Sequence, residues 1–210
     1  MRHLAEVALA AALAAVAAVL GSLPLGPDRN DIPIARESPT RAEYTIVSGQ
    51  TMATYRYQRR GTDWTEVVID VRSDGDRPAV GDVQAFVGGC YVRSSPTDPG
   101  TNFTGCGIEV TAPREELSTD LYRRIRAAVM RTDLEPDPGR CPDDGDCMVL
   151  SVPEADPRGW ALAGFDHGTF SVLLERETGL AWHLSVTEGA EEIYTFAVRC
   201  MEPGPVPCEH

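Results

Sequence analysis

The 210-residue chain contains no lysine, and arginine supplies all 19 of its strongly basic side chains. Without lysine, no side-chain amine is available to form a Schiff base or to act as a basic catalyst. The formal net charge is -13, and no basic stripe offsets it. Proteins that bind nucleic acid or dock on anionic lipid headgroups need such a stripe, so the charge argues against both functions.

Motifs of common catalytic centres are also missing. No G-x-S-x-G sequence is present to place a serine on a sharp turn, as one major type of Ser-His-Asp triad requires. Neither C-x-x-C nor the close cysteine couples of zinc sites occur, which disfavours thiol redox chemistry and structural zinc. We therefore expect a protein that is not an enzyme and that holds no cofactor or metal ion.

Long apolar runs are absent except near the N-terminus, where residues 7–20 are almost uninterrupted Ala, Val and Leu after Arg2. This pattern is typical of an export signal or a membrane anchor. A retained helix over 7–25 would be about 28 Å long, just enough to span the hydrocarbon core. Ala15 and Ala17 offer a cleavage site, so residues 1–25 are either a signal peptide or an anchor. Both interpretations put the rest of the chain outside the cytoplasm, secreted or membrane-anchored with the N-terminus inside.

Residues 26–41 carry three prolines among charged residues and predict an extended linker. Beyond them, alternating runs separated by turn residues predict strands at 44–47, 52–58, 64–71, 83–87, 90–93, 107–110, 170–174, 180–186 and 193–198. Short connections between successive runs predict antiparallel hairpins. We expect a single domain over 42–201 and a C-terminal tail over 202–210.

One segment has helical periodicity instead. Between residues 113 and 132, Leu117, Leu121, Ile125 and Val129 recur at every fourth position, and the arginines lie largely off this stripe. Together with the strands, this helix predicts an α+β fold. We expect a curved, half-barrel-like antiparallel meander with one main amphipathic helix packed on its concave face.

Six cysteines follow the apolar segment and fall into three couples of sequence neighbours: Cys90, Cys106, Cys141, Cys147, Cys200 and Cys208. Six cysteines allow about 15 pairings, of which nearest-neighbour pairing is the simplest. In an oxidising compartment such cysteines are structural disulfides rather than reactive thiols. A loop of the size between Cys90 and Cys106 would be stabilised by about 3 kcal/mol in the chain-entropy model.

Three other features have a functional and a simpler interpretation. The acidic segment 133–146 has part of a calcium-loop pattern, interrupted by a cysteine, and we expect a solvated loop. Asp166 and His167 would be the centre of a hydrolase only with a nucleophile nearby, and we expect a turn. Asn102 begins an Asn-Phe-Thr glycosylation pattern, which marks a surface loop. The abundance of Ala, Gly, Pro, Asp and Val is typical of GC-rich coding, as in actinobacteria.

The segment Leu-Leu-Glu-Arg-Glu-Thr-Gly-Leu, residues 173–180, continues through Trp182-His183-Leu184 to the predicted strand at 193–198. It resembles the periplasmic lipoprotein-carrier (LolA/LolB-like) superfamily, in which a strand ends in an acidic residue, a T-G-L turn follows, and two more strands complete a curved sheet. The resemblance covers under half of the chain. The helix that precedes the first strand in that superfamily is missing here, and no cysteine stands where mycobacterial relatives carry a lipid.

The resemblance implies a half-barrel whose concave face holds acyl chains and is partly filled by a helix. The side chains expected to line this cavity, or the core, are Trp64, Leu117, Leu121, Ile125, Phe170, Trp182 and Phe196. We therefore expect a non-enzymatic extracytoplasmic protein that binds an acyl chain or a lipoprotein tail. The alternative is a membrane-anchored sensor or interaction ectodomain with a protein partner. An apolar cavity that opens to solvent would distinguish the two, because only a carrier needs one.

Overall fold

In a computed structural model, the chain divides into two compact units, residues 1–31 and 32–210. The structure describes residues 38–73, 75, 78–108, 117, 137–142, 146–152, 168–204 and 206–209, all of them in the second unit. The predicted signal or anchor over 1–25 and most of the predicted linker over 26–41 lie outside these residues. In the described part, no helix has the length and apolar character needed to cross a membrane.

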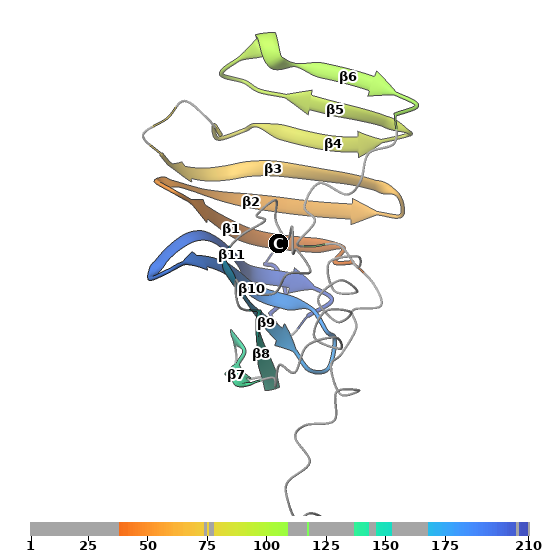
Figure 1. Cartoon of the computed structure of the whole chain (residues 1–210). Coiled ribbons are helices and arrows are strands. Elements are labelled where there is room, and N and C mark those ends of the chain that lie inside the picture. Colours follow the sequence, from red (N-terminus) through yellow and green to blue (C-terminus); the bar gives the residue numbers. More distant parts are fainter. Residues whose placement is uncertain are drawn as a thin grey trace, which may run out of the picture. The chain divides into compact units, whose positions relative to one another are not determined.

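The described residues form one antiparallel sheet of eleven strands (Figure 1). The elements are β1 (Arg41–Ser48), β2 (Thr51–Arg60), β3 (Asp63–Arg72), β4 (Val83–Val87), β5 (Cys90–Ser94), the 3-10 helix η2 (Pro99–Thr101), β6 (Phe103–Cys106), β7 (Asp137–Arg140), β8 (Asp146–Val152), β9 (Thr169–Glu175), β10 (Ala181–Glu188) and β11 (Glu191–Glu202). In space the order is β6-β5-β4-β3-β2-β1-β11-β10-β9-β8-β7. Two meanders, β1–β6 and β7–β11, therefore meet where the first strand pairs with the last.

Alternation of buried and more exposed side chains explains why these segments form strands. In β1, Ala42, Tyr44 and Ile46 are buried, and the residues between them are less so. Strands β3 and β11 alternate in the same way. Because successive side chains of a strand point to opposite faces, the buried groups collect on one face of the sheet. We call it the core face.

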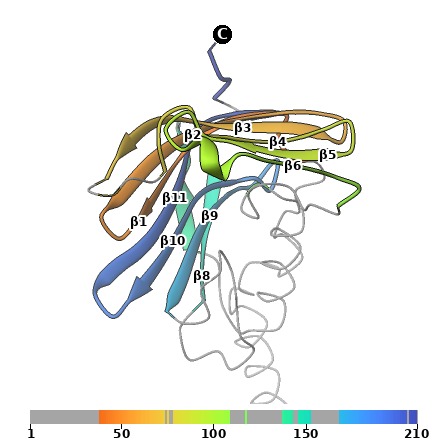
Figure 2. The same cartoon turned by 90° about the horizontal axis from the view of Figure 1, so that it is seen from above.

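Four register shifts interrupt the ladders of this sheet. They lie in the pairs β1–β11, β10–β11, β9–β10 and β2–β3. A β-bulge adds one residue to one strand, bends that strand and increases its twist. The sheet is accordingly not flat: Figure 2 shows β8, β9 and β10 running at a steep angle to β2–β6.

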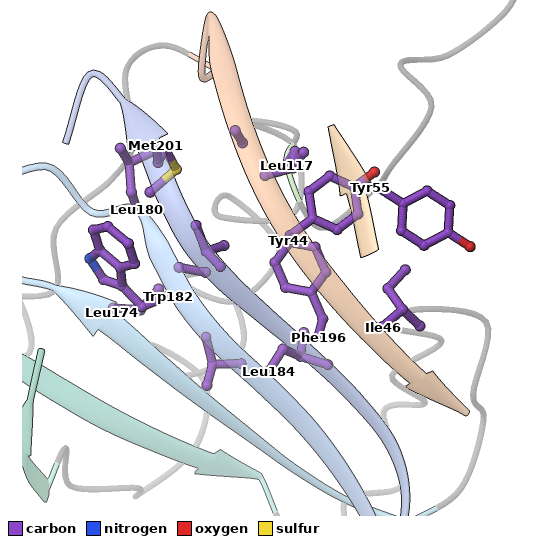
Figure 3. Close-up of a cluster of buried hydrophobic side chains, with 14 of the residues drawn as sticks. Tyr44, Ile46, Tyr55, Leu117, Leu174, Leu180, Trp182, Leu184, Phe196 and Met201 are labelled. Carbon is purple, nitrogen blue, oxygen red and sulfur yellow. The ribbon is translucent and has the colours of Figure 1, made fainter. Parts of the chain in front are cut away.

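Large aromatic and aliphatic side chains fill the core face. The largest fully buried ones are Trp182, Tyr44, Tyr57, Phe196, Met148, Leu150, Leu174 and Leu180. The Tyr44 ring contacts Tyr55 of β2, with ring centroids 5.4 Å apart, and Phe196 of β11, with centroids 5.0 Å apart (Figure 3). Such aromatic pairs contribute about 0.5–1.5 kcal/mol beyond the area they bury. Tyr44 therefore connects the two meanders through side chains as well as through the backbone.

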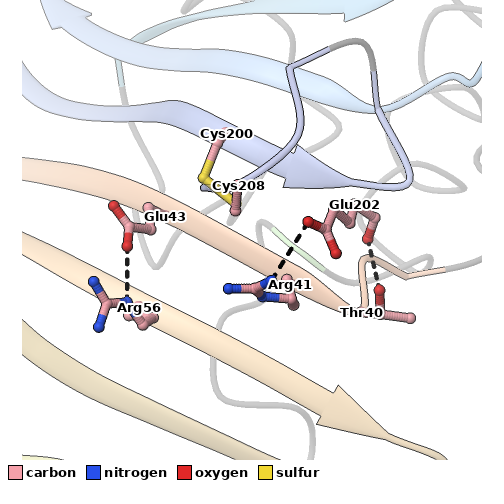
Figure 4. A network of polar contacts seen from close by, with 7 residues as sticks. All are labelled: Thr40, Arg41, Glu43, Arg56, Cys200, Glu202 and Cys208. Carbon is pink, nitrogen blue, oxygen red and sulfur yellow. Dashed lines mark hydrogen bonds and ion pairs between the residues drawn. A yellow bond between two sulfur atoms is a disulfide. The ribbon is translucent and has the colours of Figure 1, made fainter. Parts of the chain in front are cut away.

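Polar contacts join β1 to both of its neighbours (Figure 4). Arg56 Nε on β2 lies 2.7 Å from Glu43 Oε1, and an Arg41 guanidinium nitrogen lies 3.6 Å from Glu202 Oε1 on β11. Thr40 donates its backbone N–H and its hydroxyl to the Glu202 carbonyl, at 2.7 and 3.0 Å. Exposed ion pairs contribute only about 0–1 kcal/mol, so the backbone ladder holds this part of the sheet together more than the charges do.

All six cysteines form disulfides: Cys90–Cys106, Cys141–Cys147 and Cys200–Cys208. This is the nearest-neighbour pairing that the sequence predicts. The first disulfide joins residues that lie opposite each other on β5 and β6. The second closes the connection between β7 and β8, and the third returns the C-terminal tail to β11.

The predicted α+β class is wrong. No α-helix occurs in the part of the chain that the structure describes, which is antiparallel sheet with the short η2 helix. The helix predicted over 113–132 falls, apart from Leu117, outside the described residues. A stripe of apolar side chains at every fourth position indicates one helical face, but the class depends on which elements form the sheet and cover it. Here eleven paired strands form the described core.

Two details of the strand prediction also fail. The strand predicted over 107–110 does not begin at 107: β6 ends at Cys106, and Gly107 has a φ of +69°, a left-handed conformation that glycine adopts readily, while residues 109 and 110 lie outside the described residues. Strands β7 and β8 are not predicted at all: β7 is Asp-Pro-Gly-Arg, which is typical of a turn, whereas β8 is mostly apolar and follows directly on an acidic segment. The buried Met148 and Leu150, two residues apart, are the pattern that could have revealed β8.

Replacing Cys90 and Cys106 together by alanine should lower the free energy of unfolding by about 3 kcal/mol, the value for a loop of this length. Their sequence separation is 16, against 8 for Cys200–Cys208, which serves as the control pair. Hydrogen exchange should accelerate at β5 and β6 in the first variant and at the end of β11 in the control. Uniform acceleration over all strands in both variants would contradict these local roles.

Candidate functional site

The core face brings together five of the seven predicted cavity or core residues. Trp64, Leu117, Phe170, Trp182 and Phe196 are at most 5% exposed and belong to one hydrophobic cluster, part of which Figure 3 shows. Four of them lie on β3, β9, β10 and β11, and Leu117 comes from outside the sheet. The other two, Leu121 and Ile125, are not among the described residues. A continuous cluster of this kind can be the core of the domain, and it can equally be the wall of a site for an apolar ligand.

Trp182 differs from the rest of the cluster because its indole N–H is buried without a hydrogen-bond partner. Ala181 lies opposite Leu174 and His183 opposite Leu173, so Trp182 is the extra residue of a bulge in β10. The bulge allows the consecutive Ala181 and Trp182 both to be buried, which a regular strand does not permit on one face. A buried donor without an acceptor costs about 1–3 kcal/mol, so this N–H is suited to an acceptor supplied by a ligand.

Glu66 places a carboxyl group within the core face, where it is 2% exposed. It alternates with Trp64 and Val68 along β3 and lies opposite Tyr57 of β2. The Tyr44 hydroxyl donates a hydrogen bond to Glu66 Oε2. A buried carboxylate needs such donors, because it has lost its water. Glu66 is not among the residues predicted from the sequence, although its position between Trp64 and Val68 places it on the buried face.

Tyr57 adds a second polar group beside Glu66 and is also 2% exposed. Burial raises the pKa of its phenol above the ordinary value of 10.0, while the Arg59 guanidinium lowers this pKa and Glu66 raises it. Burial is the largest of the three effects. The folded protein therefore favours the neutral phenol over the phenolate more strongly than the unfolded chain does.

A pocket of about 310 Å³ lies where β2, β3, β4 and β5 meet the loop that precedes β4. Tyr55 and Val68 of the hydrophobic cluster form part of its wall, so the pocket borders the core face. Most of the remaining wall is polar and includes Glu66, Asp82, Gln84 and Arg93. This lining differs from the predominantly apolar walls of sites for apolar ligands.

The segment that carries the superfamily resemblance forms a closed turn between β9 and β10. Gly179 donates its N–H to the Glu175 carbonyl at 2.9 Å, and Glu175 donates its own N–H to the Leu180 carbonyl at 2.9 Å. The Thr178 hydroxyl donates to the Glu175 carboxylate, which is buried. The acidic residue at the strand end therefore accepts a hydrogen bond from the turn that follows it.

The remaining sequence candidates either lie outside the described residues or take part in local contacts. The Asp166–His167 dyad is outside the described residues. Of the acidic segment, Asp146 is described and forms an ion pair with Arg176 at 2.9 Å. Within the described ranges, no three His, Cys, Asp or Glu side chains are grouped so that they could hold a metal ion. Asn102 holds its loop together, because its Oδ1 accepts the backbone N–H of the residue after β5 at 2.8 Å.

Tyr44→Phe should destabilise the fold by about 1–3 kcal/mol, because it removes a donor from a buried carboxylate and keeps the ring. Tyr91→Phe is the matched control: it removes a phenol that donates to the Gln84 side chain at 3.0 Å in a partly buried setting. We expect a smaller effect there, as for a neutral hydrogen bond. Urea unfolding measures both variants, and equal losses would show that Glu66 does not depend on Tyr44.

The raised pKa of Tyr57 predicts a loss of stability at alkaline pH. The unfolded phenol ionises near its ordinary pKa of 10.0 while the folded phenol stays protonated, so the contribution of Tyr57 is complete below that pH. It is then lost as pH rises through the folded pKa, by up to about 1.4 kcal/mol per pH unit. The stability advantage of the wild type over Tyr57→Phe should therefore shrink in urea unfolding from about pH 9 to 11. A constant difference between the two proteins would contradict the shift.

No protein-family model matches this sequence, and comparison with curated proteins gives no match. Solved structures resemble its fold. A crystal structure of MucB matches with a TM-score of 0.50 and 13% identity, over 86% of this chain and 58% of that chain. This chain thus spans less than two thirds of MucB, and at such low identity the likeness shows the fold alone.

Two further structures match less well. The complex of MucA and MucB from Pseudomonas aeruginosa gives a TM-score of 0.48 at 15% identity, over 83% of this chain and 54% of that chain. A LolA superfamily protein from Nitrosomonas europaea gives 0.30 at 10% identity, over 87% and 91%. The predicted resemblance to the LolA-like superfamily is thus borne out only as a weak likeness: a LolA superfamily protein is among the solved structures that match, and nothing about the role of this chain follows from it.

Proposed function

We propose that this protein is a non-enzymatic binding protein outside the cytoplasm that holds an acyl chain or a lipoprotein tail against its core face. One observation carries the proposal: a continuous cluster of buried apolar side chains on one sheet face contains a donor, the Trp182 indole N–H, without an acceptor. An acyl chain ends in an ester or amide carbonyl, which is such an acceptor. The chain itself gains about 0.8 kcal/mol for each CH₂ that it buries.

The position of Trp182 suits this role. It lies on β10 among the leucines of the cluster, with Leu174, Leu180 and Leu184 labelled near it in Figure 3. A carbonyl bound to Trp182 would leave its hydrocarbon chain in contact with apolar groups of β9, β10 and β11. The remaining predicted residues, Leu121 and Ile125, keep their proposed place in the same lining.

The disulfides support the proposed location. Three disulfides without a free cysteine among the described residues are typical of an oxidising compartment. Residues 1–25 would provide export or anchoring and 26–41 the linker, with the domain over 42–201 and the tail over 202–210. The proposal places this domain in the extracytoplasmic space, either secreted or anchored.

Native mass spectrometry of the full chain, produced by export and purified in a detergent that is not a lipid, tests the proposal. We expect a second species heavier by the mass of an acylated molecule, which disappears after organic extraction. A protein that carries only its three disulfides, and that also binds no added fluorescent fatty acid, would overturn the proposal.

Trp182→Phe should weaken the binding of a fluorescent fatty-acid ester by about two- to tenfold, because it keeps an aromatic ring and removes one neutral hydrogen bond. Trp64→Phe makes the same chemical change on the same sheet face. Its indole nitrogen is not among the buried unpartnered atoms, so we expect a smaller effect. Equal affinities of the wild type and both variants for the ester would show that Trp182 does not bind the ligand.

A second function, an interaction domain with a protein partner, is favoured by apolar groups at the β6 end of the sheet. Phe103 and Ile108 are 50% and 42% exposed. Both side chains lie close to Gly105, within 3.2 Å of where its Cβ would be. If the fatty-acid experiments fail, charged substitutions of Phe103 and Ile108 should abolish capture of the partner, and unchanged capture would exclude this surface.

A further inference from the structure

We propose that the polar pocket beside β4 binds a small ligand that carries an α-ammonium group next to a carbonyl or carboxylate. Free amino acids and the first residue of a peptide share this chemistry. The proposal does not depend on the acyl-chain function, because it concerns a different set of side chains. The volume of the pocket, about 310 Å³, is at the lower end of the range for small-molecule sites, so the pocket suits a ligand as small as an amino acid.

The charges in the pocket are arranged by depth. The carboxyl group of Glu66 lies at the buried end, at 2% exposure, and Arg93 lies at the exposed end. Arg93 has no ion-pair partner in the described part of the chain, so its guanidinium is available to an anionic group. A ligand with a positive group at one end and an oxygen anion or carbonyl at the other matches this order.

Asp82 provides the second carboxylate, and only one of its two oxygens has a hydrogen-bond partner. Its Oδ2 accepts the backbone N–H of Ala79 at 3.0 Å, whereas its Oδ1 is buried and has no hydrogen-bond partner. Leaving a charged acceptor unpaired is costly, more so than for a neutral group. An ammonium group has three donors, so it can supply the missing bond to Asp82 and reach a second acceptor as well.

The walls of the pocket are fixed before a ligand binds. The loop that carries Asp82 is tied to β3, because Val68 donates its N–H to the Asp82 carbonyl at 2.9 Å and accepts from Gly81 at 2.8 Å. At the end of β5, the Ser95 N–H donates to Asn102 Oδ1 at 2.8 Å. A preformed site loses little conformational entropy on binding.

Gln84 completes the recognition of the oxygen end. Its Oε1 accepts the hydroxyl of Tyr91 at 3.0 Å, which leaves its amide N–H₂ to donate to a ligand oxygen. A metal ion is a less suitable occupant, because no group of three acidic, histidine or cysteine ligands is present within the described residues. The combination of two carboxylates, one guanidinium and one amide favours an organic ligand with both kinds of charge.

The test measures amide chemical shifts of the full chain during titration with three series of probes. Glycine, leucine, phenylalanine and arginine are used as free amino acids, as their carboxamides and as their N-acetyl derivatives. We expect saturable shifts at Gln84, Ser94 and Ser95 with the first two series and none with the acetylated series, which lacks the ammonium group. Tighter binding of the free acids identifies free amino acids, whereas equal or tighter binding of the amides identifies peptide termini.

Variants assign the two ends of the ligand. Asp82→Asn should weaken all amine probes at least about tenfold, and Arg93→Gln should weaken the free amino acids more than the amides. Asp70→Asn changes an exposed aspartate on β3 outside the pocket and should leave affinity unchanged. The proposal is overturned if no amine probe shifts the pocket amides, if acetylated probes bind equally well, or if Asp82→Asn, shown to be folded by its spectrum, binds like the wild type.

Discussion

The pairing of β1 with β11 is the interaction on which the rest of the sheet depends. Every other ladder joins strands that follow each other in the chain, whereas this one brings Arg41 beside Glu202. Closing so long a loop has an entropic cost that local hairpins do not have, although this cost grows only slowly with length. The ring contacts of Tyr44 with Tyr55 on one side and Phe196 on the other help to offset this cost. Without this ladder the two meanders would each expose half of the core face.

Two of the three disulfides lie where the ladders offer least support. Cys90–Cys106 and Cys141–Cys147 join the outer strands at the two ends of the sheet, and each of those ends consists of short strands. Cys200–Cys208 fastens the chain just beyond the central β1–β11 pair. Outer strands have a neighbour on one side only and open most readily. Covalent links at these places confine local opening without altering the core face.

Polar groups set into the apolar face are the basis of both proposed binding sites. Trp182 offers a donor on β10, and Glu66 offers a carboxylate on β3, on opposite sides of the β1–β11 pair. A bulge buries the first, and the phenol of Tyr44 supports the second. The two proposed ligands differ accordingly: an acyl carbonyl needs a donor in an apolar setting, and an ammonium group needs carboxylates in a polar pocket. One sheet therefore presents two chemically distinct surfaces.

The sequence by itself determined most strands, the hairpin turns and the nearest-neighbour pairing of the cysteines. These features depend on residues that are close together in the chain. It also placed Phe170, Trp182 and Phe196 in strands that proved to be buried. Only the tertiary structure decided that two meanders join through β1 and β11, that the described elements are strands apart from one short 3-10 helix, and that Glu66 is buried. Tyr44, its hydrogen-bond donor, is 22 residues away in the chain, and Asp82 and Arg93 reach one pocket from separate segments. Local patterns encode the elements, whereas burial and sites depend on which distant elements pair.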